Sequence, residues 1–356
     1  MTESDPVRPS SPAATTPKLD IFLARPRGYC AGVDRAIDIV DLALELYGPP
    51  VYVRHEIVHN SHVVGALRER GAVFVEELSG VPEEAVLVLS AHGVSPTVRE
   101  EAAARRLKMI DATCPLVTKV HLEALRMEKD GYTIVLIGHR GHTEVEGTMG
   151  HVPRSIVLVQ NAAEVADLVV PDPERVAYLT QTTLSLDECA ETVAALKARF
   201  PKLRSPSSDS ICYATQNRQN AVKAVVPRID LLLVVGSKQS SNSNRLREAG
   251  EIRGVRSFLI DNAEEIQAEW LVDARRIGVT AGASTPEYLV EEVLSRLRSE
   301  GGKVIEFEVI PEAVNFNLPK NLLDDLKEDP RGEMLLLSAG RSLAGRARGP
   351  VDKSGQ

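Results

Sequence analysis

The sequence predicts an α/β protein in which three similar small α/β domains are arranged with pseudo-threefold symmetry around a common centre. Short β-rich segments alternate with segments of helical periodicity, which is typical of parallel sheets built from βαβ units. The 356 residues exceed what one hydrophobic core usually supports. Similar cysteine-containing segments also recur at positions 30, 114 and 212, so the repeat intervals are 84 and 98 residues.

The individual elements follow from composition and periodicity. The strand candidates are short runs rich in Val, Ile and Leu: Ile21–Ala24, Val51–Val53, Val86–Leu89, Thr133–Ile137, Leu231–Val235 and Ile277–Thr280. Apolar residues repeat every three or four positions in the helix candidates Ala36–Leu46, Leu116–Lys129, Glu188–Ala198 and Tyr288–Leu297.

The repeat also predicts how the chain is divided. We expect three α/β domains and a C-terminal extension that packs back on the core, over residues 19–113, 114–211, 212–300 and 301–330. Residues 1–18 consist largely of Pro, Ser, Thr and Ala with little to bury, so we expect a disordered tail. We expect a second flexible tail over residues 331–356.

Composition excludes several classes of protein. A formal net charge of −8 and an aromatic content of 4% argue against a nucleic-acid binder, which needs cations and stacking rings. No apolar run approaches the ~18–20 residues of a membrane span, and the first residues do not resemble a secretory signal. Four cysteines in so long a chain do not make a disulfide scaffold. We therefore expect a cytoplasmic protein with reduced thiols.

Three of the four cysteines occupy equivalent positions, each directly before a helix. They lie in RGYCAGVDRAIDIV, DATCPLVTKVHLEAL and DSICYATQNRQNAVKAV and are Cys30, Cys114 and Cys212, whereas Cys189 lies within a helical segment and is expected to be structural. A thiolate at a helix N-terminus is stabilised by the dipole and the free N–H groups. Three converging thiolates suit zinc with a fourth ligand, or an iron–sulfur cluster. A four-iron cube held by three cysteines would leave one iron open to a substrate.

Each cysteine is followed by two strand ends that finish in polar loops, and ligands gather at the carboxyl ends of strands in α/β sheets. These loops carry His59, His92, His142, Ser240, Ser241, Asn242 and Ser284. Hydroxyl and amide groups at helix starts bind oxyanions, although each could simply cap its helix, and a single strand-end histidine is often structural. Because several polar residues recur in parallel positions, we expect a phosphate or diphosphate ligand.

Two further residues suggest acid–base chemistry. Glu144 follows His142 by two residues, so on an extended segment the two side chains would share a face and place a carboxyl group beside the phosphate site. Thr182, in LTQTTLS, offers a hydroxyl to the same region. The alternatives are an ordinary surface glutamate and a threonine that only caps its helix.

The ordered motifs together resemble the 4-hydroxy-3-methylbut-2-enyl diphosphate reductase family over roughly residues 19–320. They are PRGYCAGVDRAI, YVRHEIVHN, SAHGVS, DATCPLVTKVH, GHTEVEGTMG, TQTTLS, ICYATQNRQ, VGSKQSSNSNRL and VTAGAST. The two tails lie outside the resemblance.

The resemblance implies three α/β domains around a central [4Fe–4S] cluster held by Cys30, Cys114 and Cys212. It implies that the diphosphate is bound by His59, His92, His142, Ser240, Asn242 and Ser284, with Ser241 adjacent, and that Glu144 and Thr182 lie near the substrate hydroxyl. The implied reaction is the last step of the methylerythritol phosphate route, a reductive dehydroxylation that gives isopentenyl and dimethylallyl diphosphate. Single electrons would come from a ferredoxin or flavodoxin-type donor.

Two alternative functions use the same residues. A zinc-dependent phosphate-ester enzyme would hold a colourless metal, so visible absorption of an anaerobic sample distinguishes it from an iron–sulfur enzyme. A non-catalytic iron–sulfur sensor would not need six polar strand ends directed at one anion, and it would not turn over the substrate.

Overall fold

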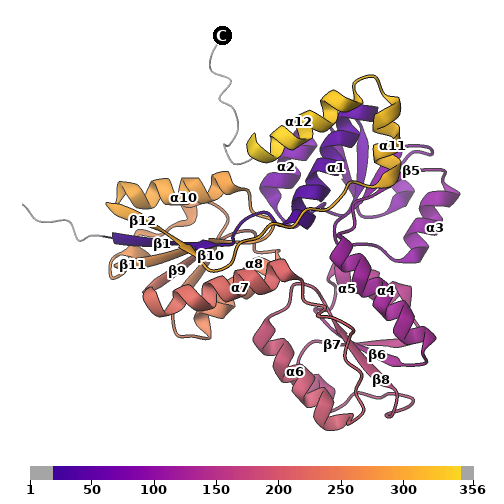
Figure 1. The fold of residues 1–356 in the computed structure, drawn as a ribbon, viewed down its shortest axis with the longest axis horizontal. Helices are drawn as coiled ribbons and strands as arrows, with labels where there is room; N and C mark the ends of the chain where they lie inside the picture. Colours follow the sequence, from indigo (N-terminus) through magenta and orange to yellow (C-terminus); the bar gives the residue numbers. More distant parts are fainter. Residues whose placement is uncertain (1–18, 346–356) are drawn as a thin grey trace, which may run out of the picture.

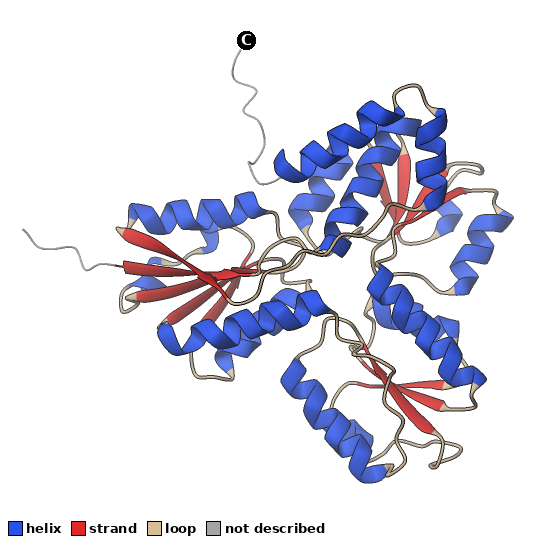
Figure 2. Cartoon of the chain, in the orientation of Figure 1, coloured by secondary structure: helices blue, strands red, loops and turns tan. Residues whose placement is uncertain are grey.

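The computed structural model describes residues 19–345, which form three parallel β-sheets flanked by helices (Figures 1 and 2). The three units are arranged around a common centre in Figure 1, as the repeat predicts. All six predicted strands and all four predicted helices are present, and most extend by a few residues at their ends. Within the described residues, no helix has the length and apolar character needed to cross a membrane.

The first unit is a four-stranded sheet with the order β3-β2-β4-β5. Its elements are β2 (Val51–Arg54), β3 (Ala72–Val75), β4 (Val86–Leu89), β5 (Lys108–Asp111), α1 (Ala31–Tyr47), α2 (Ser61–Glu69) and α3 (Pro96–Ala104). The second unit is a three-stranded sheet with the order β7-β6-β8. Its elements are β6 (Thr133–Ile137), β7 (Ile156–Val159), β8 (Val176–Thr180), α4 (Pro115–Lys129), α5 (Thr143–His151) and α6 (Leu186–Arg199).

The third unit is a five-stranded sheet with the order β10-β9-β11-β1-β12. Its elements are β1 (Leu19–Arg25), β9 (Leu231–Val235), β10 (Arg256–Ile260), β11 (Arg276–Ala281), β12 (Gly302–Glu308), α7 (Tyr213–Val225), α8 (Ser241–Glu251), α9 (Ala268–Leu271) and α10 (Glu287–Ser299). Every residue of β9 is buried, as expected for a central parallel strand covered by helices on both faces.

The placement of β1 corrects the predicted domain boundary at residue 19. Instead of joining the first unit, β1 pairs in parallel with β11 and β12, so the first described strand lies in the same sheet as strands more than 250 residues later (Figure 1). Local periodicity identifies a strand but carries no information about which distant strand it will pair with. The predicted extension over residues 301–330 likewise begins as strand β12, an integral member of this sheet.

The chain passes between units at the three cysteines. After β1 it passes through Cys30 into α1, which packs on β2 in the first core; after β5 it passes through Cys114 into α4, which packs on β6 in the second. The chain then leaves the second unit and passes through Cys212 into α7, which packs on β9 in the third. The first unit therefore begins at the cysteine, as the other two do.

The predicted C-terminal tail is also corrected. Helices α11 (Lys320–Glu328) and α12 (Gly332–Gly345) pack on α1, and Leu322, Leu326 and Leu335 join the first hydrophobic core. The short apolar run in the sequence was too brief to predict α12, because its buried face appears only against α1. Residues 1–18 and 346–356, the remainder of the two predicted tails, lie outside the described residues.

Candidate active site

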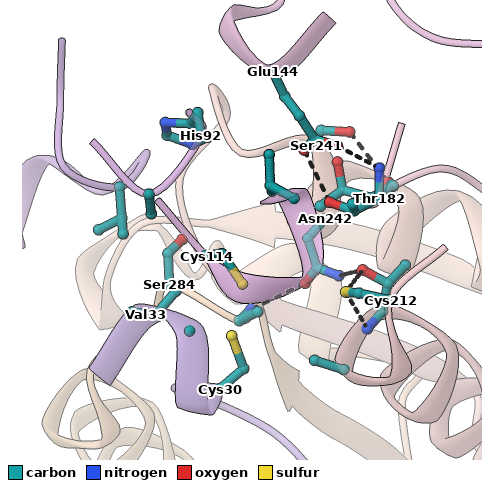
Figure 3. A pocket seen from close by; sticks show the side chains of 18 of the residues that line it. Cys30, Val33, His92, Cys114, Glu144, Thr182, Cys212, Ser241, Asn242 and Ser284 are labelled. Carbon is teal, nitrogen blue, oxygen red and sulfur yellow. Dashed lines mark hydrogen bonds between the residues drawn. The ribbon is translucent and has the colours of Figure 1, made fainter. Parts of the chain in front are cut away.

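All twelve residues predicted for the site line one pocket, with an empty volume of about 710 Å³ that is partly open to solvent. They come from all three units, which meet at the centre of the molecule (Figures 1 and 3). They are Cys30, His59, His92, Cys114, His142, Glu144, Thr182, Cys212, Ser240, Ser241, Asn242 and Ser284.

The three cysteines are held in equivalent ways. Cys30, Cys114 and Cys212 are the N-cap residues of α1, α4 and α7, as the sequence predicts. Each backbone N–H donates to a carbonyl in a strand-end loop of the unit that the chain is leaving: Cys30 to Ala283 (3.2 Å), Cys114 to Ala91 (3.0 Å) and Cys212 to Thr182 (3.0 Å). The threefold repeat therefore extends to the hydrogen bonds that position the thiols.

Glycine at position 32 keeps the region beside two of the thiols clear of a side chain. The side chains of the three cysteines are directed toward the same region in Figure 3. A Cβ atom at Gly32 would lie 2.7 Å from Sγ of Cys114 and 3.8 Å from Sγ of Cys30, so glycine leaves this region free. Within the described residues, no group of three or more His, Cys, Asp and Glu side chains is arranged to hold a single metal ion.

Burial changes the expected acidity of these thiols. It raises the pKa of Cys30, raises that of Cys114 to about 12 and raises that of Cys212 to about 11. The backbone N–H groups at the helix starts favour the thiolates, but desolvation is the larger effect. The helix N-termini therefore favour the thiolates, as the sequence indicates, but burial outweighs that effect. Metal binding would displace the thiol protons.

Three histidine rings cluster together in the same pocket. The ring centroids of His59 and His92 are 4.3 Å apart and stacked, and the His142 ring lies 5.5 Å from His59 and 5.9 Å from His92. Burial lowers the pKa of His92 and lowers that of His142 to about 3, and neighbouring imidazoles add to both effects. Buried Nδ1 of His92 has no hydrogen-bond partner within residues 19–345.

The third unit supplies hydroxyl and amide groups. Oγ of Ser240 accepts from the Ser243 N–H (3.3 Å) and caps α8, so one serine has the capping role that the sequence left open. Asn242 accepts from the Ala283 N–H (3.0 Å) and donates to Thr215 Oγ1 (3.4 Å), while Ser284 Oγ donates to the His59 carbonyl (3.2 Å). These bonds fix the polar groups at the rim of the cavity.

Glu144 and Thr182 form a buried pair. The Thr182 N–H donates to Oε1 of Glu144 (2.6 Å), and the Thr182 hydroxyl donates to Oε2 (2.9 Å; Figure 3). Desolvation raises the pKa of Glu144 to about 7, although both bonds from Thr182 oppose the shift. A carboxyl group with this pKa is suited to give up a proton near neutral pH.

The route by which His142 and Glu144 reach the pocket differs from the expectation. They do not lie on an extended segment, because α5 begins at Thr143 and His142 is its N-cap, accepting from the Glu144 N–H (3.2 Å). Residues two apart at a helix start do not share a face as they do on a strand. Both side chains nevertheless line the cavity.

Sequence reasoning missed two polar residues that support the site. The Thr215 N–H donates to Sγ of Cys212 (3.4 Å), and Thr215 Oγ1 lies 3.2 Å from the same sulfur. Gln181 donates through Nε2 to Thr183 Oγ1 (3.0 Å) and accepts from the His139 N–H (3.0 Å). The signal for Thr215 was its position three residues after Cys212 at a helix start.

Cys189, the fourth cysteine, is buried in α6, in the core of the second unit.

Comparison with known proteins agrees with this geometry. Residues 21–298 match the LytB protein family. The 4-hydroxy-3-methylbut-2-enyl diphosphate reductase of Azoarcus sp. (strain BH72) is 59% identical over 304 residues, which cover 85% of this chain and 97% of the relative. A reductase of the same name from Burkholderia mallei, numbered 2, is 57% identical and covers 85% of this chain and 93% of its own length.

Solved structures show the same fold. The E-1-hydroxy-2-methyl-but-2-enyl-4-diphosphate reductase from Plasmodium falciparum aligns with a TM-score of 0.86 and 41% identity, covering 88% of this chain and 99% of that one. A structure of (E)-4-hydroxy-3-methyl-but-2-enyl diphosphate reductase, described as the terminal enzyme of the non-mevalonate pathway, aligns with a TM-score of 0.58 and 32% identity, covering 79% of this chain and 99% of that one. The family resemblance inferred from the motifs is confirmed. The chain belongs to the LytB protein family, the family of the 4-hydroxy-3-methylbut-2-enyl diphosphate reductases.

Proposed function

We propose that the chain reductively removes the hydroxyl group of (E)-4-hydroxy-3-methylbut-2-enyl diphosphate and releases isopentenyl and dimethylallyl diphosphate, the last step of the methylerythritol phosphate route. The reaction breaks a C–O bond, forms a C–H bond, consumes two electrons and two protons, and releases one water. The observation that carries the proposal is one pocket lined by three thiols together with imidazole, hydroxyl, amide and carboxyl groups.

The thiols of Cys30, Cys114 and Cys212 would hold a [4Fe–4S] cluster. The equivalent helix caps and the space left by Gly32 support this assignment. When bound, the cluster supplies single electrons and one Lewis-acidic iron without a protein ligand.

The polar residues would bind the diphosphate. A diphosphate presents several anionic oxygens, and the neutral imidazoles of His92 and His142 would gain protons more readily beside that negative charge. Ser240, Asn242 and Ser284 would donate from the third unit, at or near the N-termini of α8 and α10, where the helix dipoles favour an anion. Binding there would direct the other end of the substrate toward the cysteines and Glu144.

Glu144 would supply the proton that the leaving hydroxide requires. Its carboxyl group is buried and has a pKa raised to about 7, so a substantial fraction of it holds a proton near neutral pH. The Thr182 hydroxyl lies 2.9 Å from Oε2, close enough to orient the substrate hydroxyl and to pass the proton on.

We further propose that the chain works in the cytoplasm and receives single electrons from a ferredoxin or a flavodoxin-type protein. Reduced thiols and cluster chemistry both require a reducing compartment.

Anaerobic turnover tests the proposed function. The purified chain, with dithionite and a viologen as reductant, should convert (E)-4-hydroxy-3-methylbut-2-enyl diphosphate to isopentenyl and dimethylallyl diphosphate. The sample should be brown. A colourless zinc-containing sample that hydrolyses phosphate esters would contradict the proposal. So would an iron-containing sample that leaves the diphosphate unchanged.

A further inference from the structure

Arg218 is a buried cation outside the set of residues described above. Its side chain is only 1% exposed, although burying an arginine is costly unless its donors are paired. It lies on α7, the helix capped by Cys212, and Nη1 donates to the Ala214 carbonyl in the first turn (3.0 Å). Such a buried charge needs a structural or electrostatic reason.

The guanidinium also binds the loop that leads to Cys30. Nε and Nη2 both donate to the Gly28 carbonyl (3.2 and 2.9 Å), and Nη2 donates to the Tyr29 carbonyl (3.3 Å). Gly28 has a positive φ of 65°, and a Cβ atom there would lie 3.3 Å from the Thr285 carbonyl, so this turn is tightly packed. One side chain therefore joins the helix of one cysteine to the loop of another.

A third segment completes this contact. Between β12 and α11 the chain crosses from the third unit to the first, alongside the segment that links β1 to α1 (Figure 1). From this crossing, Glu312 accepts from Nη1 of Arg218 through both carboxylate oxygens (3.0 and 3.2 Å) and from Asn217 Nδ2 (3.1 Å). The Glu312 side chain is 15% exposed, so the ion pair is largely shielded from water.

We propose that Arg218 is a positioning residue of the three-cysteine site, holding the Cys30 loop at a fixed place relative to Cys212. We also propose that its charge, partly offset by Glu312, sets the reduction potential of the group that the cysteines bind. A fixed positive charge stabilises the reduced, more negative state of a cluster, and a fixed negative charge has the opposite effect. This inference rests on the proposed iron–sulfur function.

Three variants separate the two roles. Arg218→Met removes charge and hydrogen bonds, so the midpoint potential should become more negative and iron should be lost faster to a chelator, since contacts that support ligands are worth about 10–100-fold in metal affinity. Arg218→Lys keeps the charge but cannot reach all the carbonyls; iron loss should accelerate while the potential stays near that of the parent. Glu312→Gln keeps the shape and removes the negative charge, so the potential should become more positive.

Arg199→Met is the matched control. Arg199 donates to the carbonyls of Val165, Ala166 and Leu168 in the second unit, so it makes similar contacts away from the pocket. This variant should change neither the potential nor the rate of iron loss. The measurements are redox titration followed by visible absorption, and iron and sulfide content during chelator challenge.

Opposite shifts in Arg218→Met and Glu312→Gln would support the proposal, because a purely structural role cannot reverse sign between them. If Arg218→Met does not fold, Glu312→Gln decides: an unchanged potential would overturn the electrostatic role, and unchanged iron retention in Arg218→Lys would overturn the positioning role. A parent protein that binds no iron would overturn the proposed function as well. A loaded, active parent with unaffected variants would overturn only this inference.

Discussion

Two sets of residues line the pocket, the three cysteines (the cysteine wall) and the polar side chains (the polar wall), and they follow the threefold repeat to different degrees. In the cysteine wall (Cys30, Cys114 and Cys212), a cysteine stands at each of three equivalent N-cap positions and makes the same type of backbone hydrogen bond, although Cys212, unlike the other two, also caps its helix through its sulfur. In the polar wall, equivalent strand ends carry different groups: imidazoles come from the first and second units, hydroxyls and an amide from the third, and the acid pair Glu144 and Thr182 from the second alone.

The difference matches what each wall would hold. A cluster has chemically similar corners, so one residue type at three equivalent positions is sufficient. The substrate has a multiply charged end and a single reacting hydroxyl, and therefore needs unlike groups at unlike places. The repeated positions thus place the three cysteines, and the positions that differ between the units supply the groups suited to the substrate.

The largest effect is expected when one of the three cysteines is replaced, and it tests whether their positions are equivalent. Replacing Cys30, Cys114 or Cys212 with Ser should abolish cluster retention and turnover in each case, because each sulfur occupies an equivalent position at a helix start. Anaerobic iron and sulfide analysis provides the measurement. Cys189→Ser is the control and should retain the cluster, because Cys189 is buried in α6 within the core of the second unit. Full retention of the cluster in any of the three variants would show that the three cysteines are not equivalent.

The next largest effect is expected at Glu144, which belongs to the acid pair that the second unit alone supplies. Glu144→Gln keeps the size and the ability to bond Thr182, but cannot supply a proton. The rate should fall by roughly 10²–10⁴-fold, the usual contribution of general acid catalysis, while cluster content and substrate binding are largely kept. Thr182→Val should cost less, because its hydroxyl orients and relays but is a poor acid. A near-normal rate in Glu144→Gln would mean that the proton comes from elsewhere.

The pH dependence of the rate follows from the same carboxyl group. Burial raises the pKa of Glu144 from 4.5 to about 7, so the acid form is present below pH 7 and is lost as the pH rises through that value. The rate should therefore decline on the alkaline side. The negative charge of bound diphosphate would move the decline to higher pH, because it disfavours a second anion nearby. Rate measurements from pH 6 to 9 should show this limb in the parent and not in Glu144→Gln.

A smaller effect is expected in the anion site, where an imidazole, His92, can be compared with a hydroxyl of the third unit, Ser284. His92→Phe keeps a ring that can stack on His59 but removes both ring nitrogens, so the KM should rise by about 10–100-fold, the value of ~1.5–3 kcal/mol for a hydrogen bond to a charged group. Ser284→Ala should raise the KM less, since its hydroxyl already donates to the His59 carbonyl. Initial rates across substrate concentrations separate KM from kcat. A larger rise of the KM in Ser284→Ala than in His92→Phe would mean that the hydroxyl contributes more to diphosphate binding than the imidazole does.

The sequence was informative wherever a signal was local. Cysteine positions, strand-end loops and the buried run of β9 all follow from patterns within a few residues, and the structure agrees with them. Long-range pairing was not accessible: neither the position of β1 beside β11 and β12 nor the docking of α12 on α1 leaves a local pattern. The rise in the pKa of the thiols was not accessible for a related reason, since desolvation depends on distant segments that close over them.

The smallest effect on catalysis is expected at α12, outside both walls. Leu335 is 6% exposed and packs in the core shared with α1, whereas Leu337 on the same helix is 59% exposed. Leu335→Ala should lower the free energy of unfolding by about 2–5 kcal/mol through the cavity it leaves, and Leu337→Ala should change it by less than about 0.5 kcal/mol. Thermal or denaturant unfolding of the two variants measures the difference.

Turnover per bound cluster should be unchanged in both variants, because Leu335 packs on α1 within a hydrophobic core rather than against the pocket that Cys30 lines. The N-terminus of α1 is instead held by the Cys30 N–H bond to Ala283 and by the Arg218 contacts to Gly28 and Tyr29. If Leu335→Ala selectively lost the cluster while remaining folded, α12 would be part of the support for the cysteine wall. The three cysteines would then differ in support, because α12 packs on α1, the helix that follows Cys30.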